Sequence, residues 1–177
     1  MKIAITGHMD IERCFGIKQE NNHVYNEVAF NRTYDEIEQY LIWFCKKNHI
    51  KFQDLQLISG MARGVDEVFA HIAMNNNLKL ILSIPKSVEF HRHKVVKDTP
   101  NIKIQAINYN TILTYPNIEI VEVNDNLNKG GYGYFLARNQ SMVDLSDFVL
   151  SYKRYESTGT MDCINRAIQQ NKYYGNI

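Results

Sequence analysis

The sequence predicts an α/β fold of Rossmann-like architecture, a three-layer sandwich built on a mostly parallel sheet of about five strands. Two observations predict it. Short apolar runs that suit buried strands alternate with segments whose apolar residues recur at three- and four-residue spacing, and Gly-containing turns follow several of these runs. Such alternation favours parallel strands joined by right-handed crossovers, and ligands of these sheets bind beyond the carboxyl ends of the strands.

The first strand is predicted over residues 2–6, an Ile-rich run that stops at Gly7 and suits a strand buried on both faces. No period holds over residues 8–31, which predicts a long ordered loop or lid, and loops of this length are often functional. Residues 33–36 (Thr-Tyr-Asp-Glu) match a capping box. A helix with one apolar stripe should follow to about residue 48.

The second strand is predicted over residues 55–59, followed by a turn over residues 60–64. A helix with a clean 3.6-residue period should begin at Val65. The third strand is predicted over residues 78–84. Residues 86–99 show no firm period, and we expect a mixture of loop and short helix there.

The last third of the chain repeats the alternation. Residues 102–114 should be helical, residues 118–123 alternate like a strand, and residues 124–133 form a polar, Gly-containing connection before a helix resumes. The fifth strand is predicted over residues 147–152. Thr160 is expected to cap a final helix.

Composition excludes several classes of protein. The 177 residues suffice for one domain, taken as residues 1–177, with 45% apolar residues and a net charge of +1. This balance argues against a nucleic-acid partner. The three widely spaced cysteines indicate reduced thiols, with no metal site and no required cofactor. The first apolar run is too short for a signal peptide and none is long enough to span a membrane, so we expect a cytoplasmic protein.

The turn after the second strand is the first candidate site. Its two glycines, four residues apart, allow close backbone approach, and the free amides of a new helix favour phosphate. The alternative is a tight turn whose Gly64 serves packing and whose Arg63 is solvated. The candidate ligand-binding residues here are Ser59, Gly60, Met61, Ala62, Arg63, Gly64 and Asp66.

Two further turns follow predicted strands. Hydroxyls and amides after the fifth strand could wrap an anion, although a simple helix cap is the alternative. After the first strand, His8 could bind substrate or act as an acid or base, or it could be a hydrogen-bonded structural residue. The candidate residues are Gly7, His8, Ser157, Thr158, Gly159 and Thr160.

Arg138 and Asn139, just before the fifth strand, complete the predicted site. An arginine there can pair with a phosphate through two hydrogen bonds, or it can simply be solvated. Asp66 and Asp162 are carboxylates near these turns, although the helix dipole alone explains acidic residues at helix amino ends.

These residues together resemble the SLOG superfamily, which includes the YpsA-like proteins, the DprA/Smf proteins and the LOG phosphoribohydrolases. The resemblance is closest to the YpsA-like branch, through a pattern of Arg-Asn, Met-Val-Asp, Asp and Gly-Thr. It implies a nucleotide pocket built from the turns at Gly7, Gly60–Gly64 and Gly159. The segments that carry it are Ile3–His8, Leu57–Ala73 and Ala137–Ala167.

The chain departs from the LOG pattern at its catalytic glutamate and at its second glycine, which is Thr158 here. The glutamate central to glycosidic cleavage in LOG enzymes is Cys163 here, and Asp162 lies one residue early, about 100° away on a helix. Asp66 or Glu67 could serve instead. The first hypothesis is therefore binding or sensing of a nucleotide or ADP-ribose-like molecule, and the resemblance to the superfamily implies a homo-oligomer.

Two other functions stay open. One is an enzyme acting on an N-glycosidic bond, a hydrolase or deoxyribosyltransferase, with Asp162, Asp66 and Glu67 as candidate catalytic residues. The other, with less support, is binding of single-stranded DNA, for which the basic residues between Arg92 and Lys97 could supply contacts, or form a solvated face.

Overall fold

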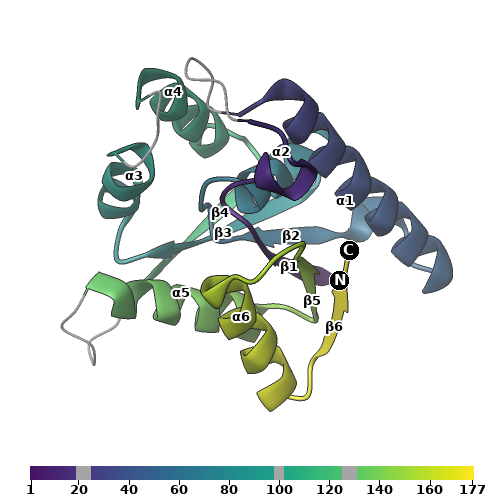
Figure 1. Ribbon diagram of the computed structural model, residues 1–177. Coiled ribbons are helices and arrows are strands. Elements are labelled where there is room, and N and C mark those ends of the chain that lie inside the picture. The colour runs from purple at the N-terminus through teal and green to yellow at the C-terminus, as the bar shows by residue number, and fades with distance from the viewer. Residues whose placement is uncertain (19–24, 98–101, 125–130) are drawn as a thin grey trace.

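The computed structural model, which describes residues 1–18, 25–97, 102–124 and 131–177, contains one six-stranded sheet. The strand order is β4-β3-β2-β1-β5-β6, and every neighbouring pair is parallel (Figure 1). The predicted α/β Rossmann-like fold is confirmed, with one strand more than expected. Because all strands point the same way, their carboxyl ends share one edge of the sheet, called here the carboxyl rim.

The strands are β1 (Lys2–Gly7), β2 (Gln56–Ser59), β3 (Lys79–Pro85), β4 (Ile118–Val123), β5 (Phe148–Tyr152) and β6 (Tyr173–Asn176). The helices are α1 (Glu27–Lys47), α2 (Val65–Asn75), α3 (Val88–Lys97), α4 (Ile102–Leu113), α5 (Gly131–Leu145) and α6 (Thr158–Gln169), with 3-10 turns η1 (Arg13–Phe15) and η2 (Phe52–Asp54). The five predicted strands are confirmed, with ends that differ from the prediction by at most one residue.

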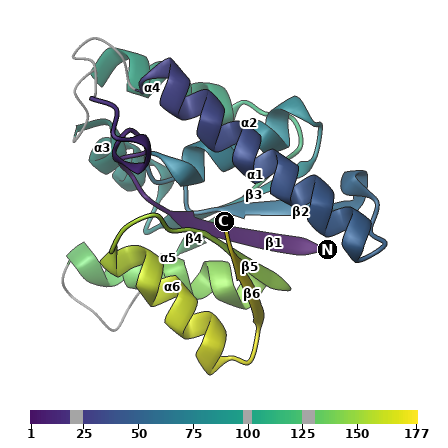
Figure 2. The same ribbon diagram turned by 45° about the vertical axis from the view of Figure 1, so that its right-hand side comes forward.

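Helices cover both faces of the sheet. Helices α1 to α4 lie on one side and α5 and α6 on the other (Figure 2). Strand β1 shows how the sequence produces these layers, because alternate side chains of a strand point to opposite faces. Ile3 and Ile5 belong to the large core shared with α1 and α2, whereas Ala4 packs with Met142 of α5. The central strands are therefore buried on both faces, as their unbroken apolar runs predict.

The predicted capping box at residues 33–36 is wrong. Helix α1 begins at Glu27, where the side chain of Asn26 accepts hydrogen bonds from the amides of Val28 and Ala29. Thr33 lies nearly two turns inside the helix, and its hydroxyl donates to the carbonyl of Ala29 at 2.8 Å. Asn26 is as good a cap as a threonine, and it stands earlier in the chain.

Other helix and loop boundaries also differ from the prediction. The predicted loop over residues 8–31 contains η1 and the start of α1, while its residues 19–24 lie outside the described residues. Residues 88–97 form the regular helix α3, and α5 begins within the predicted connection over 124–133, of which residues 125–130 are not described.

At the end of the chain, Ser157 and not Thr160 is the N-cap residue of α6, and Thr160 lies inside the first turn. Strand β6 was not predicted, because its polar and exposed residues lack the alternation of a half-buried strand. Among the described helices, none combines the length and the apolarity needed to cross a membrane.

Candidate functional site

The three predicted turns lie side by side on the carboxyl rim. Strand β1 pairs with β2 on one side and with β5 on the other, so the turns after these strands are neighbours. The next strand outward, β3, ends at Pro85 and turns into α3. The rim thus collects residues from four segments that are far apart in the sequence.

Three backbone amides of the turn over Gly60–Gly64 are hydrogen-bonded to side chains of the protein. The Met61 amide donates to the Ser59 hydroxyl at 3.0 Å, and the Ala62 amide donates to Asp66 Oδ2 at 3.3 Å. The Gly64 amide donates to the Tyr25 hydroxyl at 2.6 Å. Because these three amides already have partners, the geometry favours the tight-turn alternative over an anion cradle at this position.

Both glycines of that turn lie close to other residues, Gly60 to side chains and Gly64 to backbone. A Cβ at Gly60 would lie 2.6 Å from Nη1 of Arg138. Gly64 has a φ of +87°, and a Cβ there would lie 2.3 Å from the carbonyl oxygen of His8. The backbone of the segment after β1 is therefore pressed directly against the start of α2.

His8 joins two of the turns. Its Nε2 accepts hydrogen bonds from the backbone amides of Arg154 and Tyr155 at 2.9 and 3.2 Å. The imidazole stacks on the Tyr155 ring with centroids 3.5 Å apart. Burial, reinforced by the charge of Arg13, lowers the pKa of His8 and so favours the neutral ring that accepts these bonds. The contacts match the structural alternative for this histidine.

Asp66 and Glu67 are buried carboxylates at the start of α2. Burial raises the pKa of Asp66 to about 6, against the opposing charge of Arg138, whose Nη1 lies 3.7 Å away. Glu67 accepts hydrogen bonds from side chains of Tyr25, Gln105 and Asn108, and burial raises its pKa as well. Both carboxylates are thus engaged by the protein itself, and their catalytic roles stay predictions.

One hydrogen-bonded network joins three of the predicted site residues, Arg138, Asn139 and Asp162. Arg138 donates to the carbonyl of Gly60 at 3.0 Å and, through Nε, to the side chain of Asn139 at 3.1 Å. Asn139 donates to Asp162 at 3.0 Å, and Arg166 donates to the same carboxylate at 2.8 Å. This network ties α5 to α6 and to the turn after β2.

The first turn of α6 is the open part of the rim. Thr158 and Gly159 are exposed, and a Cβ at Gly159 would meet no atom within 4 Å. Thr160 is buried, and its hydroxyl donates to the Ser157 hydroxyl at 3.1 Å. Of the three predicted turns, this one leaves space where an anion would sit at a helix amino end.

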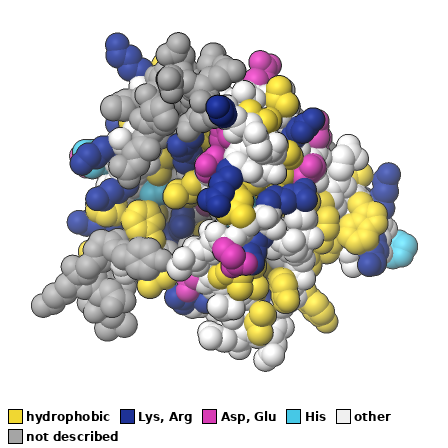
Figure 3. Space-filling view, viewed as in Figure 1, with side chains coloured by type: hydrophobic (Ala, Val, Ile, Leu, Met, Phe, Trp, Pro, Cys, Tyr) yellow, Lys and Arg dark blue, Asp and Glu magenta, His cyan; other side chains and the backbone are white. Residues whose placement is uncertain are grey.

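Sequence reasoning missed an aromatic and cationic surface where β3 passes into α3. The rings of Phe90 and Tyr134 lie 5.7 Å apart, and the Lys86 ammonium lies 5.2 and 5.7 Å from them. Lys94 stands 5.8 Å from the Phe90 ring. We call Lys86, Phe90, Lys94 and Tyr134 the platform. Figure 3 shows basic side chains gathered over α3 beside apolar ones.

Two signals for the platform stand in the sequence. Phe90 lies within a basic stretch, and Lys86 follows a strand directly. Tyr134, whose ring lies beside that of Phe90, is distant in the chain, so this pairing could not be predicted. Lys86 has a φ of 63°, and residues held at positive φ cluster at functional sites.

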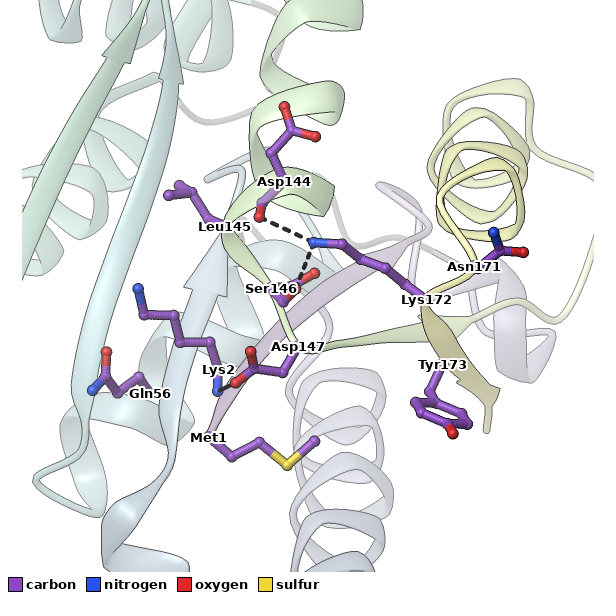
Figure 4. A pocket seen from close by; sticks show the side chains of 10 residues that line it. All are labelled: Met1, Lys2, Gln56, Asp144, Leu145, Ser146, Asp147, Asn171, Lys172 and Tyr173. Atoms are coloured by element: carbon purple, nitrogen blue, oxygen red, sulfur yellow. Dashed lines mark hydrogen bonds between the residues drawn. The ribbon is translucent and has the colours of Figure 1, made fainter.

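A cavity of about 590 Å³ lies at the opposite, amino-terminal edge of the sheet, between the starts of β1 and β2 and the ends of α5 and α6 (Figure 4). Its most prominent cation, Lys172, donates to the backbone carbonyls of Asp144 and Ser146 at 3.0 and 2.7 Å and so caps the end of α5. Among the described residues, no group of three or more His, Cys, Asp or Glu side chains could hold a metal ion.

Comparisons with known proteins agree with this architecture. A family model described as DNA recombination-mediator protein A matches residues 35–174. The X-ray structure of DNA processing protein A (DprA) from Streptococcus pneumoniae is similar, with a TM-score of 0.61 and 16% sequence identity. The match covers 99% of this chain and 49% of that one, so the chain spans about half the length of that protein. A search of curated protein sequences found no match.

Proposed function

Because the chain belongs to the DNA recombination-mediator protein A family, we propose that it binds single-stranded DNA across its carboxyl rim. The platform is the observation that carries this proposal. Unpaired bases stack on aromatic side chains without regard to sequence, while lysines neutralise the adjacent phosphates. Phe90 and Tyr134 offer two half-buried rings, and Lys86 and Lys94 stand beside them.

The proposed path of the bound DNA follows from the order of the β-strands in the sheet. From the end of β3 to the end of β5 there are three strand spacings, roughly 14 Å. The platform lies at one end of this distance and the open turn of α6 at the other. A phosphate of the same strand fits that turn, because exposed amides at a helix amino end attract anions.

This proposal replaces the expectation, from the balanced net charge, that nucleic acid is not a partner. Net charge averages over the whole surface, whereas binding depends on where the charges stand. Five exposed basic residues lie between the end of β3 and the end of α3, namely Lys86, Arg92, His93, Lys94 and Lys97. They give one side of a nearly neutral protein a local excess of positive charge.

Fluorescence anisotropy with a labelled thymidine oligonucleotide tests the proposal. We expect binding that weakens with salt, with a slope of log K against log salt of about −2 for three phosphate contacts. Lys86→Asn removes one charge while tolerating the positive φ, and should make the slope less steep by about 0.7. Phe90→Ala should weaken binding by about 1–3 kcal/mol.

Matched controls lie at the other edge of the sheet. Lys51→Gln and Tyr173→Ala alter an exposed lysine and an exposed ring there, and should leave affinity and slope unchanged. The proposal is wrong if the wild-type protein fails to bind the oligonucleotide at low salt, or if the two control substitutions weaken binding as much as the two at the platform.

A second candidate is binding of a nucleotide or ADP-ribose-like molecule, favoured by the open first turn of α6. A panel of nucleotides at millimolar concentration should raise the melting temperature, since a ligand that binds only the folded state stabilises it. Gly159→Asp fits the open space and suits a helix amino end, but its charge should repel a phosphate and abolish the shift. An equal shift in this variant would exclude the turn as the site.

We further propose that residues 1–177 form one SLOG-type domain that works in the cytoplasm as a homo-oligomer. The YpsA-like branch is part of this proposal. Its support is the pattern that begins at Arg138 and Asn139 and ends at Gly159 and Thr160.

A further inference from the structure

His91 of α3 is a buried side chain with half of its hydrogen-bonding capacity unused. Its side chain is fully buried, and Nδ1 lies 3.0 Å from the hydroxyl of Tyr109 on α4. Nε2 is also buried, and it has no hydrogen-bond partner among the described residues. Buried polar atoms are nearly always paired, so an unpaired one needs an explanation, and a bound group that takes up its hydrogen bond is one.

The partner on the other side of the ring fixes what Nε2 can do. Burial, aided by the charge of Arg138, lowers the pKa of His91 to about 3, so the ring is neutral and carries one proton. Burial also raises the pKa of Tyr109, which therefore keeps its hydroxyl proton. Among the described contacts, His91 is the one hydrogen-bond partner of that hydroxyl. The arrangement in which the hydroxyl donates to Nδ1 uses the hydroxyl proton, and it places the ring proton on Nε2, a donor without an acceptor among the described residues.

The His91 ring lies beside Phe135 of α5, at a seam between α3 and α5. The seam is built from rings, with Phe90 against Tyr134 at 5.7 Å and His91 against Phe135 at 6.4 Å. Aromatic contacts join the described residues of α3 and α5 at this seam. A flat aromatic molecule that enters between these rings would stack on them.

We propose that one base of the bound strand enters this seam and accepts a hydrogen bond from His91 Nε2. This inference rests on the proposed binding of single-stranded DNA and adds a base preference to it. Thymine presents a carbonyl oxygen, O4, where cytosine of the same size presents an amino group. A fixed N–H donor therefore favours thymine over cytosine, and Tyr109 is the positioning residue that fixes the donor.

Binding of labelled thymidine and cytidine oligonucleotides of equal length tests the inference. We expect the wild-type protein to bind the thymidine strand about ten-fold more tightly. His91→Leu removes the donor but keeps an apolar side chain, and should bring the two affinities together mainly by weakening the thymidine complex. Circular dichroism and the unfolding midpoint establish that the variant folds.

Tyr109→Phe is the second variant, and it leaves His91 in place. Without the hydroxyl, the ring proton can move to Nδ1 and Nε2 can accept from the cytosine amino group, so the preference should shrink or reverse. Nitrogen-15 NMR of the imidazole should show the proton on Nε2 in the wild-type protein and its redistribution in this variant.

The outcomes separate the two claims. If neither strand binds, the proposed function is wrong and the base preference falls with it. If both bind but the wild-type protein does not discriminate, or the preference survives in folded His91→Leu, the inference about His91 is wrong while DNA binding stands.

Discussion

Gly64→Ala should destabilise the protein by at least about 3 kcal/mol, through backbone strain and a direct clash. The residue has a φ of +87°, which side chains rarely tolerate, and a new Cβ would lie 2.3 Å from the His8 carbonyl oxygen and 2.7 Å from Met9 Cα. Neither obstacle is a flexible side chain that could swing away. Urea unfolding followed by circular dichroism measures the loss.

Gly159→Ala is the matched control for that substitution. It also replaces a glycine of a rim turn, but its Cβ would enter open space, and an alanine inside a helix is favoured over glycine by about 0.5–1 kcal/mol. We expect no loss of stability, or a small gain. Equal midpoints for the two variants would contradict the view that Gly64 is held by a backbone contact.

Arg138→Met should be the most damaging change at a charged residue, with an expected loss of about 3–5 kcal/mol. The substitution keeps an apolar stem of similar length but leaves the carbonyl of Gly60 and the carboxylate of Asp66 without their cationic partner. Both groups are buried, so water does not replace the arginine. Denaturant unfolding at pH 8 provides the measurement.

The pH dependence of this loss identifies Asp66 as its cause. The pKa of Asp66 is about 6 in the folded protein against 3.8 for the free side chain, so the folded state binds more protons between these values and stability rises as pH falls through 6. Without Arg138 the pKa rises further. The loss of stability should therefore be smaller at pH 5 than at pH 8, and adding Asp66→Asn should recover part of it. A loss that changes neither with pH nor with this second substitution would show that Asp66 is not its cause.

Local patterns predicted the fold well because the central strands and helices carry strong periodicity. Ile3, Ala4 and Ile5 could be assigned to a doubly buried strand from their types alone. The cap of α1 could not, since Thr33 and Asn26 are both good caps and only packing decides between them. Strand β6 has no apolar pattern, and its pairing with β5 supplies its order.

The sequence predicted that the three turns lie together, but not the contacts within each turn. The three turns meet because parallel strands place their carboxyl ends together, which follows from the alternation of elements. The state of each turn could not be predicted, because it depends on contacts such as that between Tyr25 and Gly64, 39 residues apart. The platform depends in the same way on Phe90 and Tyr134.

The direction of β1 has a practical consequence for attaching the protein to a surface. The strand runs from Lys2 at the amino-terminal edge to Gly7 on the rim, roughly 20 Å at the usual rise per residue. Met1 therefore lies at the far side of the sheet from the platform. A tether or fluorophore linked through Met1 should leave the platform and the carboxyl rim unobstructed in biosensor and single-molecule measurements.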